Sequence, residues 1–296
     1  MSTSDDHPGK ALYGPILAWY DGHARDLPWR RPEASAWSVM VSEFMLQQTP
    51  VARVLPAHEA WLERWPTPAD LAAESPGEAV RMWGRLGYPR RALRLHRSAT
   101  YLVSVHGGEV PRDREELRKL PGVGDYTAAA IAVFAFGERL EVLDTNVRRV
   151  LYRLLAGWEF PPTIVTQGER HWARDLLPPE DATAATWSVA LMELGALVCR
   201  ARAPDCDACP VAEQCAWRVA GYPAYDGPPR RGQTWHGTDR QCRGRIMALL
   251  RESHEPVHRS RIEATWPETD QRERCLAGLL ADGLAVAAGP DSYQLP

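Results

Sequence analysis

The sequence predicts a mainly helical protein with a small C-terminal domain, and three observations support this prediction. Short amphipathic segments with the apolar spacing of helices run through most of the chain. The chain contains 25 prolines and 22 glycines, and residues such as Pro66, Gly87 and Pro89 separate these segments. Strand-like alternation of apolar and polar residues is nearly absent before residue 280. We therefore expect short helices joined by tight turns.

Helical segments are expected through the first 200 residues. Their predicted ranges are 14–20, 38–48, 51–64, 69–73, 76–85, 90–106, 114–119, 126–136, 145–154 and 186–198. The segment 221–232 is rich in Gly, Pro and Arg, which is typical of a linker. After it we expect helices at 239–252, 259–265 and 269–282, and then a hairpin of 284–287 and 292–295. This order indicates a winged helix-turn-helix; the alternative is a helical cap on the main domain.

The composition indicates a globular protein of the cytoplasm. Hydrophobic residues make up 45% of the chain and charged residues 25%. The polar N-terminus, MSTSDDHPGK, resembles neither a secretory signal nor a membrane anchor. No stretch approaches the roughly 20 apolar residues that span a bilayer. We therefore expect no membrane partner.

Positive charge is concentrated in two segments, although the net charge is −3. Residues 81–97 contain six arginines and no acid, and residues 226–251 contain six arginines against two aspartates. Because the distribution of charge matters more for nucleic-acid binding than its sum, DNA remains a candidate partner.

Four of the six cysteines, Cys199, Cys206, Cys209 and Cys215, have the spacing C-x6-C-x2-C-x5-C. Four thiolates on so short a segment can enclose one metal centre. The spacing alone leaves zinc and a 4Fe–4S cluster both open. Cys242 and Cys275 stand apart from this group.

The loop Leu120-Pro121-Gly122-Val123-Gly124 separates two predicted helices. Its glycines allow a tight turn and let the backbone amides approach a ligand closely. The helix start behind it favours an anion. The alternative is an ordinary tight turn between helices.

Two carboxylates are candidates for cleaving a purine N-glycosidic bond, which needs an acid for the leaving base and an anion beside the cationic sugar. Glu43 lies in a mostly apolar stretch that would favour its protonated form; a solvated helix residue is the alternative. Asp144 lies at a predicted helix start, where capping would keep it ionised; a plain N-cap is the alternative.

Several motifs together resemble the MutY family of adenine-specific DNA glycosylases, in the endonuclease III superfamily. They are LPWR at 27–30, SEFMLQQT at 42–49, RLGY at 85–88, LPGVGDYTAAAI at 120–131 and the four cysteines, within about residues 11–220. The resemblance implies a mainly α, helix-hairpin-helix DNA glycosylase fold. A six-helix domain would occupy 31–140, and an iron–sulfur cluster domain 11–30 plus 141–220. A linker at 221–235 and a winged helix-like domain at 236–296 would follow.

The resemblance also implies an activity and the residues that perform it. A monofunctional glycosylase would excise adenine mispaired with 8-oxoguanine or guanine in base excision repair. Glu43 would protonate N7 of the flipped adenine, and Asp144 would stabilise the oxocarbenium-like sugar. Asn146 and Tyr126 match positions that support this aspartate and the sugar. Relatives that also cut the strand have lysine in place of Tyr126, so little lyase activity is expected.

A DNA-binding set and a cofactor follow from the same resemblance. The predicted DNA-binding residues fill the gap left by the flipped base, line its pocket or hold the backbone; they are Gln48, Tyr88, Gly122, Gly124, Trp29, Arg30 and Arg91. For Trp29, a place in the core is the alternative. We expect a 4Fe–4S cluster on the four cysteines, an alkali ion at the hairpin, and a monomer that binds mismatched double-stranded DNA.

Three departures from the family pattern bear on base selection. Ser188-Val189 replaces an Asn followed by Gln or Glu, whose polar side chain hydrogen-bonds the adenine. Pro89 stands where Tyr or Ala is common. The usual C-terminal domain, which inspects 8-oxoguanine, is replaced by the shorter predicted winged helix. The opposite base would be read by the catalytic domain, by the winged helix, or less stringently.

Two other functions stay open. A thymine or uracil mismatch glycosylase would share Tyr126 and Asp144 but lack Glu43. A non-catalytic iron–sulfur DNA-binding regulator would use the winged helix and would need neither carboxylate. An endonuclease III-like lyase is disfavoured by Tyr126.

Overall fold

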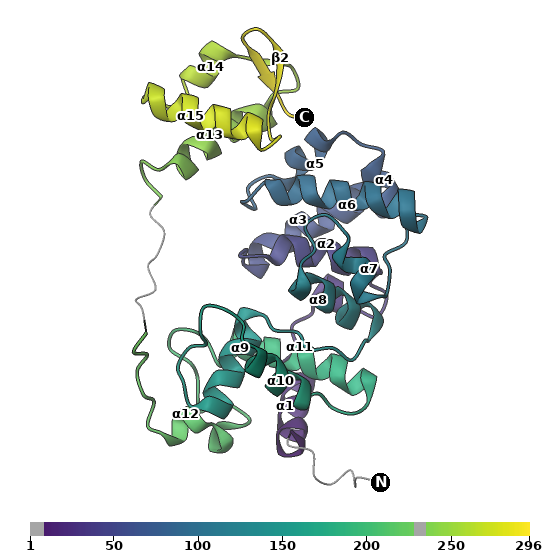
Figure 1. The fold of residues 1–296 in the computed structure, drawn as a ribbon, viewed down its shortest axis with the longest axis vertical. Helices are drawn as coiled ribbons and strands as arrows, with labels where there is room; N and C mark the ends of the chain where they lie inside the picture. The colour runs from purple at the N-terminus through teal and green to yellow at the C-terminus, as the bar shows by residue number, and fades with distance from the viewer. Residues whose placement is uncertain (1–8, 228–234) are drawn as a thin grey trace. The chain divides into compact units, whose positions relative to one another are not determined.

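The predicted mainly helical fold is confirmed in the computed structural model, which describes residues 9–227 and 235–296 (Figure 1). The chain forms two compact units. One contains Met1–Val39, Arg112–Arg118 and Val123–Pro228, and the other contains Met40–Pro111, Lys119–Gly122 and Pro229–Pro296. Among the described residues, no helix is both long and apolar enough to cross a membrane. Most of the second half of the predicted linker lies outside the described residues, and the predicted domain boundaries stay predictions.

The first unit is a set of helices and short helical turns. They are α1 (Lys10–His23), η1 (Pro28–Arg30), α7 (Arg114–Arg118), α8 (Asp125–Phe136), α9 (Thr145–Leu151), η2 (Tyr152–Ala156), α10 (Gln167–Asp175), α11 (Asp181–Leu197), η3 (Ala212–Gln214) and α12 (Ala216–Val219). Its core forms where α1, α9, α10 and α11 meet, and it includes Ile16, Leu151, Trp187 and Leu194. This packing fixes α9, which carries Asp144 at its N-cap.

The second unit begins with the C-terminal part of α2 (Ala36–Leu46), the helix that joins it to the first unit. Then follow α3 (Val51–Arg64), α4 (Pro68–Ala72), α5 (Pro76–Trp83) and α6 (Arg90–His106). The Thr67 side chain caps α4 and Ser75 caps α5, which explains where these two helices begin. Trp61 packs edge-on against Trp65 and Trp83, with ring centroids 4.7 and 5.7 Å apart.

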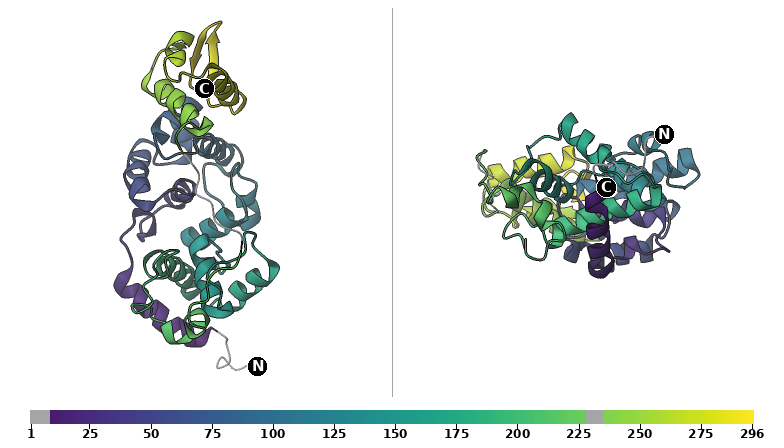
Figure 2. Two further views of the ribbon diagram at one scale, coloured as in Figure 1. Left: turned by 90° about the vertical axis from the view of Figure 1, so that its left-hand side faces the viewer. Right: turned by 90° about the horizontal axis from the view of Figure 1, so that it is seen from below.

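The C-terminal part of the second unit has the order expected for a winged helix (Figure 2). It contains α13 (Asp239–Glu252), β1 (Val257–His258), α14 (Arg259–Glu263), α15 (Thr269–Ala281), β2 (Val286–Gly289) and β3 (Ser292–Gln294). The three strands form an antiparallel sheet in the order β1-β3-β2. The hairpin was expected from the sequence, whereas β1 was not, because two residues are too few to show an alternating pattern.

This C-terminal domain is docked on α5. Arg81 donates to the carbonyl oxygens of Arg251 and Ser253, and Arg251 donates back to the Val80 carbonyl at 3.3 Å. A Cβ atom on Gly77 would collide with the Pro296 carbonyl and lie 3.1 Å from the Leu295 Cβ. The last residues of the chain therefore lie directly against α5, at a position where only glycine fits.

Cys242 and Cys275, which stand apart in the sequence, lie close together between α13 and α15. Both are buried, and Cys275 donates to the Asp239 carbonyl at 3.6 Å. Burial, helped by the Cys275 thiol, raises the pKa of Cys242 to about 12. These thiols therefore act as small core side chains.

Candidate active site

Glu43 lies on α2 and is only 5% exposed. Its helix neighbours Val41, Phe44 and Met45 are fully buried. The structure thus places this carboxyl below the surface. Its role as a proton donor stays a prediction.

Asp144 is the N-cap of α9, as expected, and both of its carboxylate oxygens accept hydrogen bonds. The Val147 amide donates to Oδ1 at 2.6 Å, and the Asn146 side-chain amide donates to Oδ2 at 2.8 Å. We expected capping to keep this group ionised. Burial nevertheless raises the pKa of Asp144, against the opposing effects of these bonds and of Arg149. The site therefore holds a desolvated carboxylate that a cation would stabilise strongly.

Asn146 is itself held by Arg149, which sequence reasoning did not identify. Arg149 donates to Asn146 Oδ1 at 2.8 Å, to the Gly195 carbonyl at 2.6 Å and to the Cys199 carbonyl at 2.7 Å. A Cβ on Gly195 would lie 2.7 Å from the Asn146 Cβ, so α11 also presses against this residue. One chain of hydrogen bonds thus connects the first cysteine of the cluster-like motif to Asp144.

Tyr126 lies in the first turn of α8 and is partly buried. It packs against the small cluster of Ala130, Val133 and Val142. Val142 is two residues before Asp144 in the chain. Tyr126 therefore lies on α8, which packs against the segment that leads to Asp144.

The predicted hairpin has two glycines in different environments. Gly122 has φ +89°, and a Cβ there would lie 2.9 Å from the Cβ and Cδ of Arg94. Gly124 is the N-cap of α8, without a side-chain cap, and a Cβ there would meet nothing within 4 Å. Gly122 is thus required by the fold, while Gly124 leaves open space at a helix start.

Gln48 and Tyr88, predicted to fill the gap in the DNA, share an unusual backbone. Both are exposed, and both have positive φ, 55° and 46°, without being glycine. This left-handed conformation is rare for such residues, and strain of this kind is concentrated at functional sites. Sequence patterns gave no sign of it.

Arg91 has a different environment from the one its DNA-binding prediction assumed. It is 4% exposed, and its guanidinium donates to the carbonyls of Phe44, Gln47 and Gly87. These bonds satisfy the open carbonyls at the C-terminal end of α2 and hold the Gly87-Tyr88 turn. Arg91 therefore positions the Gln48 and Tyr88 segments, and a direct contact of this buried guanidinium with DNA stays an untested prediction.

Trp29 and Arg30, predicted to line a base pocket, lie beside a buried glutamate. Trp29 is 6% exposed, and Arg30 lies 3.0 Å from the Glu193 carboxylate. Arg25 binds the same carboxylate through Nε at 2.6 Å and Nη2 at 2.7 Å. Although burial opposes them, these two arginines hold the pKa of Glu193 below its usual value. Burial fits the core alternative for Trp29.

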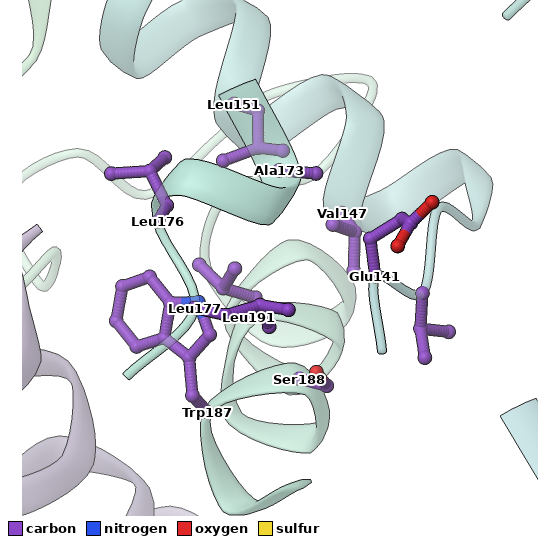
Figure 3. A pocket seen from close by; sticks show the side chains of 10 residues that line it. Glu141, Val147, Leu151, Ala173, Leu176, Leu177, Trp187, Ser188 and Leu191 are labelled. Atoms are coloured by element: carbon purple, nitrogen blue, oxygen red, sulfur yellow. The ribbon is translucent and has the colours of Figure 1, made fainter. Parts of the chain in front are cut away.

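Ser188 and Val189, the departures from the family pattern, lie on α11. Ser188 is buried and donates to the Ala184 carbonyl at 3.0 Å, so its hydroxyl is used within the helix. It lines a small pocket with Trp187, Leu191 and Val147 (Figure 3). Glu141 lies at the edge of this pocket, with its carboxylate turned away from Trp187 (Figure 3). The pocket is largely apolar and continuous with the core of the first unit.

The four clustered cysteines follow α11 and surround η3. Burial raises the pKa of Cys209 to about 11, and the three other thiols of the motif add to this rise. Arg153 lies 3.4 Å from the Cys199 sulfur, and its Nη2 is buried without a hydrogen-bond partner among the described residues. Within the described residues, no three His, Cys, Asp or Glu side chains form a site for a single metal ion. The donor set, four cysteine sulfurs with a buried arginine beside Cys199, is of the kind that holds an iron–sulfur cluster.

Comparisons with known proteins identify the fold. Residues 41–173 match the model of the HhH-GPD superfamily base excision DNA repair proteins. The fold resembles a thermostable thymine-DNA glycosylase, with TM-score 0.64 and 25% identity over 71% of this chain and 96% of that one. It also resembles endonuclease III in a DNA complex, with TM-score 0.59 and 24% identity over 70% and 94%. The fold is that of the helix-hairpin-helix DNA glycosylases.

Sequence relatives identify the family to which the chain belongs within this class of glycosylases. The adenine DNA glycosylase of Mycobacterium tuberculosis is 51% identical over 95% of this chain and 92% of its own length. That of Mycolicibacterium smegmatis is 52% identical over 95% and 94%. The human adenine DNA glycosylase is 44% identical over 70% of this chain but only 39% of its own length. The chain belongs to the adenine DNA glycosylase family.

Proposed function

We propose that the protein excises adenine from DNA in which it is mispaired with 8-oxoguanine or guanine, as part of base excision repair. The observation that carries this proposal is Glu43, a carboxyl buried in the SEFMLQQT segment of a chain of this family. The 95% coverage by adenine DNA glycosylase relatives supports the choice of base.

In the proposed reaction, Glu43 is the general acid. Adenine leaves poorly as an anion, so a proton delivered to N7 as the glycosidic bond breaks lowers the barrier. A positioned general acid contributes roughly 10²- to 10⁴-fold to such a reaction. Glu43 is only 5% exposed, so bulk water is largely kept from this carboxyl.

Asp144 is proposed to stabilise the sugar cation that remains. Burial disfavours its charge in the free protein, so a developing positive charge on the sugar is stabilised more there than it would be in water. Asn146 and the Val147 amide fix both carboxylate oxygens and thereby the direction of the carboxylate. Tyr126 supports the same sugar and offers no amine for a Schiff base, so the product is an abasic site in an uncut strand.

The DNA contacts are proposed from exposed or strained positions. Gln48 and Tyr88 fill the space left by the flipped base, and their left-handed backbone presents both side chains to solvent. Gly124 and the start of α8 bind a backbone phosphate, with an alkali ion at the hairpin. Gly122 shapes the turn, and Arg30 orders the entry segment through Glu193.

The four cysteines are proposed to hold a 4Fe–4S cluster. When bound, such a cluster would tie the segment after α11 into one fixed loop and place the charge of Arg153 next to thiolates. The carbonyl oxygen of Cys199 would then hold Arg149, and Arg149 in turn holds the side-chain amide of Asn146. A purified brown protein with absorption near 400 nm and about four iron atoms would support the cluster over zinc; a colourless zinc protein would refute it.

The activity is tested with four duplexes that carry A:8-oxoguanine, A:G, T:G and U:G. Each is incubated with the protein and scored for abasic sites with and without alkali. Release of adenine only, with strand breaks that appear only after alkali, is the expected result. Release of thymine or uracil would replace the proposal with the mismatch glycosylase alternative, and binding without release would favour the regulator.

A further inference from the structure

The C-terminal domain places an arginine on the ring of Tyr88. The Arg240 guanidinium carbon, in the first turn of α13, lies 5.4 Å from the centroid of the Tyr88 ring. The guanidinium carbon of Arg91 lies at the same distance from this ring. Tyr88 is 44% exposed, so its ring contacts cations from two parts of the second unit and still reaches solvent.

Arg240 also contacts a second aromatic ring. Its guanidinium carbon lies 5.5 Å from the centroid of Trp235, a residue that is 46% exposed. Exposed aromatic rings interleaved with arginine are the side chains with which proteins stack on bases and hold the backbone of DNA. Trp235, Arg240 and Tyr88 together form what we call the Arg240 surface.

The docking contacts make this arrangement a property of the fold rather than of one flexible side chain. Arg81 and Arg251 exchange hydrogen bonds with backbone carbonyls across the α5 contact. Arg90, two residues after Tyr88, lies 3.3 Å from Asp282 at the end of α15, and Arg243 of α13 binds the same carboxylate. Asp282 is thus paired with one arginine from each side of the contact.

We propose that the C-terminal domain binds duplex DNA through the Arg240 surface, and that Arg240 is a positioning residue for Tyr88. The inference rests on the proposed function, in which Tyr88 fills the space left by the flipped base. The domain that replaces the usual lesion-inspecting domain would then act at the damaged base pair itself. The guanidinium of Arg240 holds the ring of Tyr88 in place and attracts the DNA backbone next to that ring.

The test measures binding rather than excision. The probe is a duplex with 8-oxoguanine opposite an adenine nucleotide fluorinated at the sugar 2′ position, which slows bond cleavage. Dissociation constants are measured by fluorescence anisotropy at several salt concentrations for the wild type, Arg240→Ala and Arg245→Ala. Arg245 is the matched control, because it lies on the same helix with the same charge but stacks on Trp266 within the C-terminal domain.

Arg240→Ala is expected to weaken binding about fivefold and to reduce the slope of log affinity against log salt by about one. Arg245→Ala should change the affinity less than about twofold. In a double-mutant cycle, Arg240→Ala should lower the affinity less in the Tyr88→Ala background than in the wild type, because only its attraction for the DNA backbone remains there. Equal losses for the two arginine variants, or full additivity with Tyr88→Ala, would overturn the inference. Because excision is scored separately on cleavable duplexes, failure of the adenine activity would be recognised independently.

Discussion

The side-chain amide of Asn146 donates to Asp144 Oδ2 at 2.8 Å, while Arg149 holds the oxygen of that same amide at 2.8 Å. The orientation of the amide is therefore fixed from both ends. Asp144 is in turn restricted to one direction, toward the start of α9. A buried carboxylate held in this way is oriented to stabilise a cation.

Asp144→Asn should abolish excision but stabilise the folded protein at pH 7. Burial raises the pKa of Asp144, so its ionisation destabilises the folded state as pH rises above the usual carboxyl value of about 3.9. Asparagine keeps the N-cap through its oxygen and does not ionise, although the loss of the hydrogen bond from the Asn146 amide offsets part of the gain. The free energy of unfolding at pH 7 should rise by on the order of 1 kcal/mol, and the gain should shrink toward pH 4. Denaturant unfolding at several pH values measures this; a variant less stable than wild type at pH 7 would contradict the assignment.

Arg149→Ala should lower both stability and activity. Its guanidinium serves one buried and two half-buried acceptors, so its removal should cost about 3 kcal/mol and release the Asn146 amide. Arg148→Ala is the matched control, since Arg148 is equally buried but pairs with Glu169. Both variants should unfold at lower denaturant concentration. Only Arg149→Ala should reduce the single-turnover rate of protein that is still folded, and equal rates for the two would refute the positioning role.

The two hairpin glycines should respond differently to alanine. Gly122→Ala has both a left-handed backbone and a clash with Arg94, so it should destabilise the protein by about 2 kcal/mol. Gly124→Ala has space for the methyl group, and its stability should change by less than about 0.5 kcal/mol. If the Gly124 amide approaches phosphate, the same methyl group should still weaken DNA binding. Unchanged binding by a stable Gly124→Ala variant would remove the phosphate from this position.

The sequence predicted the positions of the helices and strands more accurately than the contacts that surround them. Helices α3, α6 and α13 have the predicted bounds, because each has clear periodicity and a proline, threonine or glycine at an end. The helix α10 was missed, since its strongly polar sequence between two Pro-containing loops shows only a narrow apolar face. The helix predicted at 145–154 ends as an α-helix at Leu151 and is followed by a π-helical turn over Tyr152–Ala156. Residue propensities do not encode such a turn.

Motifs supplied the residues with proposed chemical roles, whereas the residues that hold them in place were not predicted. Nothing in the sequence distinguishes Arg149 from Arg148 or predicts that Arg91 turns inward to cap α2. Those roles depend on which carbonyls are left open by tertiary packing. The positive φ values of Gln48 and Tyr88 are equally tertiary in origin. Arg91 and Arg149 are buried arginines, which the sequence shows only as charge.

Tyr126→Lys should add strand cleavage to base removal. A lysine amine at this position on α8 could attack the sugar carbon once the base has left and form a Schiff base. The wild type should leave abasic sites that break only with alkali, whereas the variant should yield some breaks without it and a borohydride-trapped protein–DNA adduct. If the wild type already gives such an adduct, the monofunctional assignment is wrong.

The proposed role of Glu43 is tested most directly by single-turnover excision of adenine from an A:8-oxoguanine duplex by the wild type and Glu43→Gln. Affinity for the same duplex is measured in parallel, and Glu169→Gln serves as a control at another buried glutamate. The account predicts that Glu43→Gln lowers the rate at least about 100-fold with DNA affinity retained, and that Glu169→Gln keeps the rate in folded protein. An unchanged excision rate in Glu43→Gln would contradict the assignment of Glu43 as the acid.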